Sequence, residues 1–447
     1  MNDWYDAERR VEKAQELFEQ QRWSEALEEL RAAVAINPYN SAWLFNIGLT
    51  LDEMERYEEA IDAYRQSLDI ESGDVQAMYH LGLDLERTGR FDKAIEAFER
   101  IEQIDPTFEP AYCRRISCFG ELGEHERAEE MFYLARLYKE ECPQCYYNIG
   151  CSLSTRGQYD KAIYCWQRAL DLDEANSDVH LRIAEALWGK GDLEQARRHY
   201  LTGLRQDPGN TSTLLDLGEL LMEMDRFEEA GEKFRRAIEL APEDPAGYYC
   251  HGRWLMAGER DEEAVLAFTK VLQLDPTYPG AHLRLGELHH RRREQSEARK
   301  HLRAELLLRP EDPQTLLDLS NLLIDAGEPR FAVAALKWLV QIEPQHVAGW
   351  QNLAVAQFIR GRYQDGIDSC QQALRHDPGN VMAMYNLALA YEHLGRYEDA
   401  LKTVRGALGR EPKDLSLQKL EFRLRVLKGV SRVGAGLKSL IFWRGNA

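Results

Sequence analysis

Apolar and polar residues follow one another along this chain with the period of amphipathic helices. The clearest stretch runs from Tyr385 to Pro412, where apolar residues fall on one face of two short predicted helices separated at Gly395. Pro412 ends the second helix, because proline cannot continue a helix. A helix pair this short cannot bury its apolar face alone. The pattern therefore predicts neighbouring segments of the same kind.

The same pattern recurs every 34 residues, without insertion or deletion. One column, counted back from Ala400, holds alanine at eleven of twelve positions and Gly366 at the other. A second column, twelve residues earlier in each unit, is small at eleven of twelve positions, with Ile116 as the exception. Small residues on facing helices let two backbones approach closely. A third column ends the second helices at Pro38, Pro106, Pro208, Pro242, Pro276, Pro310, Pro344, Pro378 and Pro412.

Large apolar residues occupy fixed positions between these columns, and many of those on the second helix are aromatic. A 34-residue helix-turn-helix unit with this pattern of small and large residues resembles the tetratricopeptide repeat. The resemblance implies an all-α fold, a right-handed superhelical solenoid of antiparallel helix pairs whose concave wall is lined by the first helix of every unit. Twelve units cover residues 7–414 and start at Ala7, Ser41, Val75, Glu109, Pro143, Ser177, Thr211, Pro245, Pro279, Pro313, Val347 and Val381.

The two ends of the chain differ from the repeats. Residues 1–6 form a short N-terminal lead-in. In residues 415–429, Leu417, Leu420, Leu424 and Leu427 fall on one face, which predicts a capping helix that ends at Gly429 and covers the last repeat. Residues 430–447 form a basic, apolar tail. Residues 415–447 carry seven basic residues and one acidic residue, a net charge of +6.

Composition narrows the choice of partner. The formal net charge is -20, from 76 acidic and 56 basic residues, so phosphates are repelled over most of the surface and protein or peptide partners are favoured over nucleic acid. The start of the chain lacks a basic segment followed by an apolar run, so we expect no signal peptide. No stretch approaches about 18 uninterrupted apolar residues. Together with eight unevenly spaced cysteines, these features predict a cytoplasmic protein.

The resemblance also assigns groove-facing positions, which lie at the second, fifth, sixth, ninth and thirteenth residues of each unit. Asparagine there can donate to and accept from a peptide backbone, and arginine can bind a carboxylate with two hydrogen bonds. The alternative for the aromatic residues is that they pack between units. The absence of lysine at the second position argues against a clamp for a C-terminal carboxylate. The predicted peptide-binding groove residues are Asn46, Tyr79, Arg114, Tyr147, Asn148, Arg182, Tyr249, Arg284, Asn352, Tyr385 and Asn386.

Six cysteines gather in the fourth and fifth units. Cys142 and Cys145 form a CPQC sequence at a predicted helix start, where the helix dipole favours a thiolate. Zinc requires four ligands within tetrahedral reach, so Cys113 or Cys151 would have to help complete a site. The alternative is that these are small buried apolar residues. We expect no cofactor. If a metal is bound, the candidate ligands are Cys113, Cys142, Cys145 and Cys151.

Motifs for catalysis are missing from the sequence: it contains no glycine-rich phosphate loop, nucleophile elbow or HExxH. We therefore expect a scaffold or adaptor, not an enzyme, that binds extended or helical peptide segments in the groove implied by the resemblance. Two alternatives stay open: a peripheral membrane assembly factor held to an anionic membrane surface by residues 430–447, and a metal or redox module that uses the cysteines.

Overall fold

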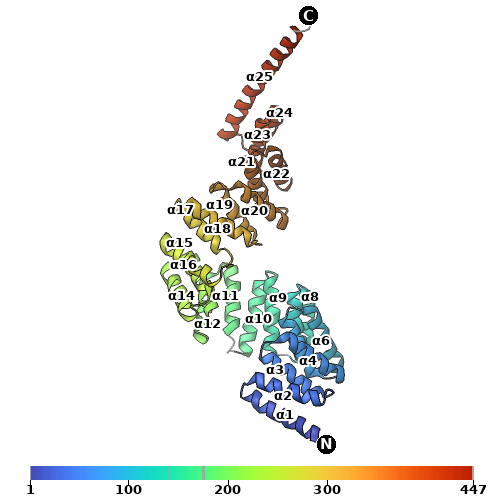
Figure 1. Cartoon of the computed structure of the whole chain (residues 1–447). Coiled ribbons are helices and arrows are strands. Elements are labelled where there is room, and N and C mark those ends of the chain that lie inside the picture. Colours follow the sequence, from blue (N-terminus) through green and yellow to red (C-terminus); the bar gives the residue numbers. More distant parts are fainter. Residues whose placement is uncertain (1, 140, 174–176, 445–447) are drawn as a thin grey trace. The chain divides into compact units, whose positions relative to one another are not determined.

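Paired α-helices make up the fold. The computed structural model describes residues 2–139, 141–173 and 177–444, and these residues form helices α1 to α25 and no strand. Within residues 1–226 and within residues 227–447, consecutive helices lie side by side in antiparallel pairs (Figure 1). The first helices of the pairs are α1 (Asn2–Glu19), α3 (Ser41–Glu53), α5 (Val75–Arg87), α7 (Glu109–Glu121), α9 (Pro143–Thr155), α11 (Ser177–Gly189), α13 (Thr211–Glu223), α15 (Pro245–Ala257), α17 (Ala281–Arg291), α19 (Pro313–Asp325), α21 (Val347–Ile359) and α23 (Val381–His393).

The second helices start a few residues later in each repeat and stop before the proline column. They are α2 (Trp23–Ile36), α4 (Tyr57–Ile70), α6 (Phe91–Ile104), α8 (His125–Tyr138), α10 (Tyr159–Leu172), α12 (Leu193–Gln206), α14 (Phe227–Leu240), α16 (Asp261–Leu274), α18 (Gln295–Leu307), α20 (Pro329–Ile342), α22 (Tyr363–His376) and α24 (Tyr397–Leu408). A final helix, α25 (Leu415–Arg444), follows.

The predicted small residues lie where the two helices of a repeat meet. Alanines of the first column, such as Ala60, are fully buried. In the second column, a Cβ added to Gly82 would stand 2.4 Å from the ring of Phe98, and one added to Gly150 would stand 2.5 Å from the indole of Trp166. Glycine is therefore required for the close approach of first and second helix, as the sequence predicts.

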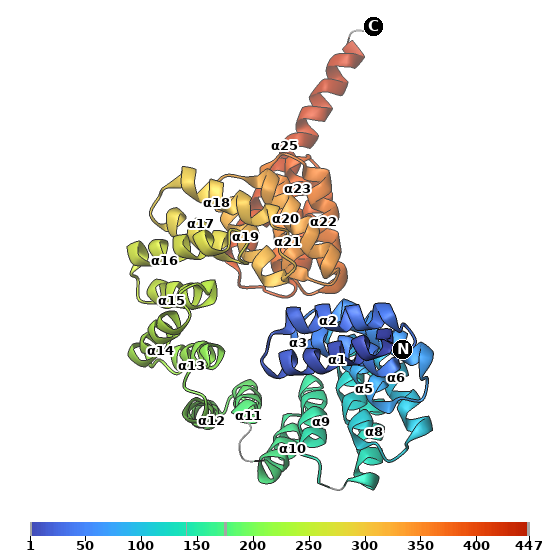
Figure 2. The same cartoon turned by 60° about the horizontal axis from the view of Figure 1, so that its bottom comes forward.

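First helices of neighbouring repeats also contact one another directly: α3 with α5, α5 with α7, α7 with α9, and α9 with α11. Among the second helices in the described part of the chain, a comparable contact between neighbouring repeats joins α18 to α20. We call the surface formed by α3, α5, α7, α9 and α11 the first-helix face. Figure 2 shows successive helix pairs of residues 1–226 stacked on one another.

The contacts group the chain into two compact units, residues 1–226 and 227–447. The boundary falls between α13 and α14, inside the seventh predicted repeat, although the 34-residue register continues through it. Within the residues that the structure describes, no helix combines the length and apolar character that crossing a membrane requires.

The C-terminal capping helix is confirmed, but its predicted end is wrong. Leu417, Leu420 and Leu424 pack into the same core as Tyr391 and Val404 of the last repeat. Helix α25 continues through Gly429 to Arg444, because a glycine inside a helix lowers helix propensity without necessarily breaking the helix. The predicted basic tail, residues 430–447, lies outside the described side chains apart from Val430. At the other end, α1 already begins at Asn2 and takes in most of the predicted lead-in.

Candidate functional site

The predicted groove residues all lie on first helices. Those of residues 1–226 lie on α3, α5, α7, α9 and α11, and those of residues 227–447 lie on α15, α17, α21 and α23. Arg182 is exposed, and Asn148 is buried, with an exposed fraction of 7%. The others are half-buried, so their side chains contact neighbours and present one edge to solvent.

Tyrosine and arginine pair between successive repeats, a feature that the sequence reasoning missed. Tyr147 at the fifth position of one repeat accepts a hydrogen bond of 3.4 Å from Nε of Arg182 at the sixth position of the next. Two further tyrosines lie near the arginine at the corresponding position of the next repeat, and they raise the pKa of its guanidinium. These are Tyr79 with Arg114, and Tyr249 with Arg284. The common separation of 35 residues is the signal that could have revealed the pairs.

A carboxylate accompanies each arginine of these pairs. Arg182 lies 3.0 Å from Glu185, and Arg284 lies 2.9 Å from Glu287. Arg114 lies 3.9 Å from Glu86. The guanidinium groups are thus held in place at the first helices by a tyrosine on one side and a carboxylate on the other, which lowers the entropy lost when they bind a partner.

A cavity of about 600 Å³ opens between α7, α9 and α11. It brings together Tyr147, Asn148 and Arg182, three of the residues predicted from sequence. Glu121 and Glu185 contribute carboxylates to its wall, and the remaining lining includes the hydroxyl groups of Ser117, Ser152, Ser154, Thr155 and Tyr159 together with Trp166.

Asn148 has a structural role at the edge of this cavity. Its Nδ2 donates a hydrogen bond of 2.9 Å to the backbone oxygen of Cys113, and its Oδ1 accepts one of 2.8 Å from Gln144. The amide therefore joins α9 to α7, and little of it is available to a peptide backbone.

Several other predicted groove residues are engaged with their neighbours. The ring of Tyr79 lies 5.4 Å from that of Phe108, and the ring of Tyr249 lies 5.1 Å from that of Tyr278, so each of these tyrosines packs against the last residue of its own repeat. Asn352 donates 2.7 Å to Asn321. The remaining three are less constrained: Asn46 lines a cavity of about 250 Å³, Tyr385 lines one of about 460 Å³, and Asn386 is half-buried on α23.

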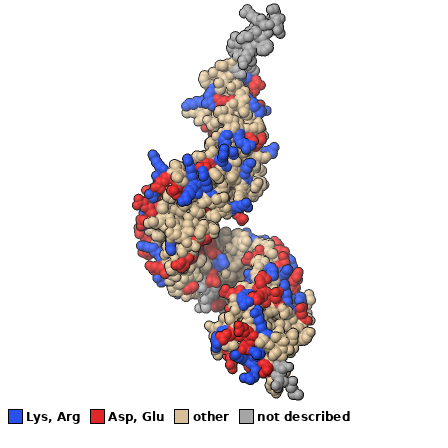
Figure 3. All heavy atoms as spheres, viewed as in Figure 1, with Lys and Arg blue, Asp and Glu red and all other residues tan. Residues whose placement is uncertain are grey.

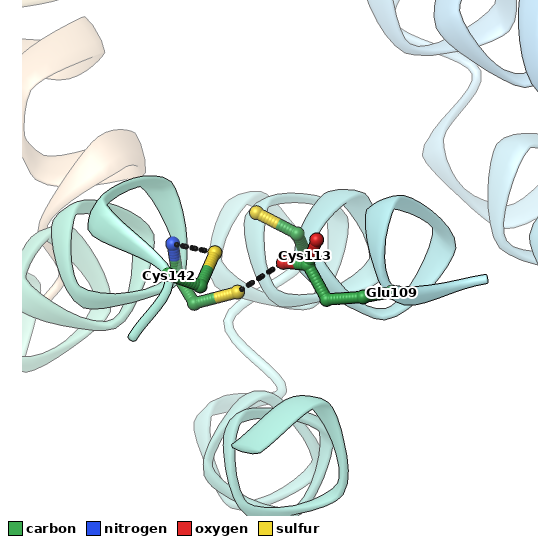
Figure 4. A group of neighbouring side chains, drawn as sticks. Glu109, Cys113 and Cys142 are labelled. Carbon is green, nitrogen blue, oxygen red and sulfur yellow. Dashed lines mark hydrogen bonds between the residues drawn. The ribbon is translucent and has the colours of Figure 1, made fainter. Parts of the chain in front are cut away.

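A second cluster lies at the N-terminal ends of α7 and α9. One ligand atom each from Glu109, Cys113, Cys142 and Cys145 lies within 4.8 Å of all the others. Figure 4 shows the carboxylate of Glu109 and the thiols of Cys113 and Cys142 turned toward one another between the two helices. The sequence identified three of these residues and missed Glu109. Cys151, the fourth candidate from sequence, lines the large cavity instead.

Hydrogen bonds within the cluster shift the pKa values of its thiols in opposite directions. The Cys113 thiol holds the pKa of Cys142 well below its usual range, with help from the thiol and the backbone N–H of Cys145. The pKa of Cys113 is raised by the same bond. Burial raises the pKa of the Glu109 carboxyl group, and Cys142 adds to this effect. The neighbouring thiols therefore favour Cys142 over Cys113 as the thiol that loses its proton more readily.

Acidic and basic side chains lie beside one another over both units in the view of Figure 3. Many are paired; for example, Arg303 of α18 lies 2.5 Å from Glu328, and Arg423 of α25 lies 2.5 Å from Glu392. Most such surface pairs contribute less than about 1 kcal/mol each to stability.

Protein-family models match much of the repeat array. A model described as a tetratricopeptide repeat matches residues 11–74, 45–107, 215–279 and 317–381, a second with the same description matches 357–421, and one described as a TPR repeat matches 153–191. The chain belongs to the tetratricopeptide repeat family. The 24 helices α1 to α24 fit twelve tetratricopeptide repeats, and α25 caps the last.

Solved tetratricopeptide repeat proteins are among the matches by structure. A tetratricopeptide repeat protein from Parabacteroides merdae is 17% identical with a TM-score of 0.49 and aligns over 56% of this chain and 99% of its own. Yeast Tom70 is 15% identical with a TM-score of 0.41 over 97% of both chains. YrrB, a TPR protein with an unusual peptide-binding site, is 21% identical with a TM-score of 0.39 over 42% of this chain and 97% of its own. Comparison with proteins of curated function finds no matching relative.

Membership of the tetratricopeptide repeat family supports a protein-interaction scaffold with protein or peptide partners. In this repeat array, two features stand apart from regular packing: the cavity between α7, α9 and α11, and the cluster of three thiols and a carboxylate next to it.

Proposed function

We propose that this chain is a scaffold or adaptor that binds a peptide segment, extended or helical, along the first-helix face. The cavity between α7, α9 and α11 is the centre of the binding site, and it receives one side chain of the peptide. Tyr147 and Arg182 contact that side chain and the backbone next to it.

The observation that carries this proposal is the convergence of predicted groove residues in one cavity. Tyr147 comes from the fifth repeat and Arg182 from the sixth, and both line the same space of about 600 Å³. Pockets of roughly 300–1,000 Å³ are typical of sites that enclose a ligand group. Tyrosine and arginine are the residue types, along with tryptophan, that most often dominate binding energy at protein interfaces.

The charge of the cavity wall favours a basic or amide-bearing side chain as its occupant. Glu121 and Glu185 contribute two carboxylates against the single guanidinium of Arg182, and Glu185 already pairs with that guanidinium. The net charge of -20 also draws a basic peptide toward the chain. Hydroxyl groups in the wall can accept the remaining hydrogen bonds of a lysine, arginine or glutamine side chain.

Binding measured on peptides selected from a random display library against the full chain tests this function. We expect the double variant Tyr147→Ala with Arg182→Ala to bind the selected peptides at least about 30-fold more weakly, which corresponds to the loss of about 2 kcal/mol typical of a hot spot. Isothermal titration calorimetry gives the dissociation constants. Asn148 is left intact because its replacement would separate α9 from α7.

The matched control carries Tyr164→Ala with Arg168→Ala, on the exposed side of the second helix α10. Tyr164 is 61% exposed, and neither residue lines the cavity. The control should bind as the unsubstituted chain does. Equal affinities for the cavity variant and the control would contradict the proposed site, and a library that yields no binding peptide would contradict peptide binding itself.

A further inference from the structure

The cluster of Glu109, Cys113, Cys142 and Cys145 has the composition and spacing of a closed metal site. Its four ligand atoms lie within 4.8 Å of one another. Tetrahedral zinc with sulfur at 2.3 Å places its ligand atoms about 3.8 Å apart, so small side-chain movements suffice to close the site around an ion. We propose that these four residues bind one zinc ion that joins the fourth repeat to the fifth.

Local sequence explains why the four ligands converge. Glu109 and Cys113 are four residues apart on α7 and so share one face of that helix. Cys142 precedes α9 as its N-cap and Cys145 lies in its first turn, a C-x-x-C spacing common in structural zinc sites. Direct contact between α7 and α9 brings the two pairs together.

A carboxylate among buried thiols is what distinguishes this cluster from ordinary packing of cysteines. The Glu109 side chain is 11% exposed, and its Oε1 lies 3.2 Å from Sγ of Cys145. A carboxylate removed from water is unfavourable unless it is paired or coordinates a metal. Nζ of Lys139 lies 3.7 Å from the other carboxylate oxygen, and no ion pair among the described residues reaches the oxygen that faces the thiols. A zinc ion would supply a positive charge there.

Hydrogen-bond donors surround the cluster as they do in known zinc-thiolate sites. The backbone N–H of Cys145 donates to Sγ of Cys142 at 3.1 Å. Nδ2 of Asn148 lies 3.6 Å from Sγ of Cys113, in addition to its bond to the backbone oxygen of that residue. Such outer donors disperse the negative charge of thiolates and orient them. The buried amide of Asn148 therefore both joins α9 to α7 and donates to a sulfur of the cluster.

The ion can reach the site. A cavity of about 280 Å³ is lined by Glu109, Cys113 and Cys142 together with Lys139. Binding transfers the thiol protons to solvent, and three thiolates with one carboxylate then hold the ion without a change in oxidation state.

Metal analysis of the full chain tests this site. Protein is produced in zinc-supplemented medium and purified with a reductant and without a chelator, and inductively coupled plasma mass spectrometry measures the zinc content. We expect one zinc ion per chain. Cys142→Ala and Cys145→Ala should reduce the content to near zero, whereas Cys118→Ala, a buried cysteine of α7 outside the cluster, should retain it.

Cobalt provides a second readout that does not depend on a variant that could misfold. Cobalt added to metal-free protein should produce thiolate charge-transfer absorption and the visible bands of a tetrahedral site, and added zinc should remove both. Glu109→Gln, a conservative change, should weaken cobalt binding by more than the about 10-fold that loss of an outer partner costs. Folded protein without zinc and without the cobalt spectrum would overturn the proposal, as would equal loss in Cys118→Ala, or a disulfide that persists between Cys142 and Cys145 in reductant.

Discussion

Asp84 on α5 is a buried carboxyl group whose ionisation opposes folding. Its side chain is fully buried, and Oδ1 accepts a hydrogen bond of 3.0 Å from Arg87. Burial, with the nearby carboxylate of Asp52, raises the pKa of Asp84 to about 7 in the folded chain. Because this pKa lies above the unfolded value of 3.8, the folded state holds the proton more tightly. Its contribution is fully present below about pH 4 and is lost as the pH rises through about 7.

We therefore expect Asp84→Asn to remove part of the fall in stability between about pH 5 and pH 8, on the order of 1–3 kcal/mol. Urea denaturation at a series of pH values, followed by circular dichroism, measures the free energy of unfolding. The control is Asp62→Asn on α4, where the side chain is 71% exposed. An unchanged pH slope in Asp84→Asn would show that this carboxyl group does not titrate differently in the folded chain.

For single residues, the sequence predicted the helix on which a side chain lies better than the contacts that the side chain makes. The repeat register correctly places Tyr147 and Arg182 on first helices, because a fixed period fixes helix face. It does not reveal that Asn148 is buried, since that depends on how closely α7 and α9 approach. Glu109 was missed for the same reason: its partner Cys145 lies 36 residues away, in the next repeat.

Helix boundaries follow the sequence closely, with one instructive exception. From the second to the twelfth repeat, every predicted start coincides with the first residue of a helix, except that α17 begins at Ala281 instead of Pro279. Gly280 has a φ of 78° and stands as the N-cap, and the buried carboxylate of Glu305 on α18 accepts hydrogen bonds from the backbone N–H groups of Gly280 and Leu283 at 2.9 and 3.0 Å. A cap supplied by another helix has no signal in the local sequence.

The capping role of α25 can be tested at one buried leucine. Leu424 is fully buried in the core of the last repeat, so Leu424→Ala removes apolar contacts and leaves a cavity. We expect a loss of about 2–5 kcal/mol in the free energy of unfolding. Leu415→Ala, on the same helix but 68% exposed, should change stability by less than about 0.5 kcal/mol. Urea denaturation compares the two, and equal effects would mean that α25 does not stabilise the repeats beneath it.

At the scale of the whole molecule, the repeat period predicts the order of helices but not how the chain divides. The register runs unbroken from residue 7 to residue 414, yet the contacts separate into two compact units at residues 226 and 227. Within each unit, contacts connect consecutive helices and neighbouring repeats. Stability in such an array is approximately a sum of terms for each repeat and each interface between neighbours.

A defect in one repeat should therefore remain local. Phe268 on α16 is fully buried, and its ring lies 2.8 Å from the place a Cβ on Gly252 would take. Phe268→Ala should cost about 3–5 kcal/mol. In hydrogen exchange followed by mass spectrometry, we expect protection to fall in α15, α16 and α17 and to remain unchanged in α21 to α24.

The control for this experiment is Leu266→Ala on the same helix, where the side chain is 70% exposed and protection should not change. If Phe268→Ala instead lowered protection equally in all helices of residues 227–447, that unit would unfold as one cooperative body. Nearest-neighbour contacts alone could not then account for its stability, because the loss at α16 would have reached helices that it does not touch.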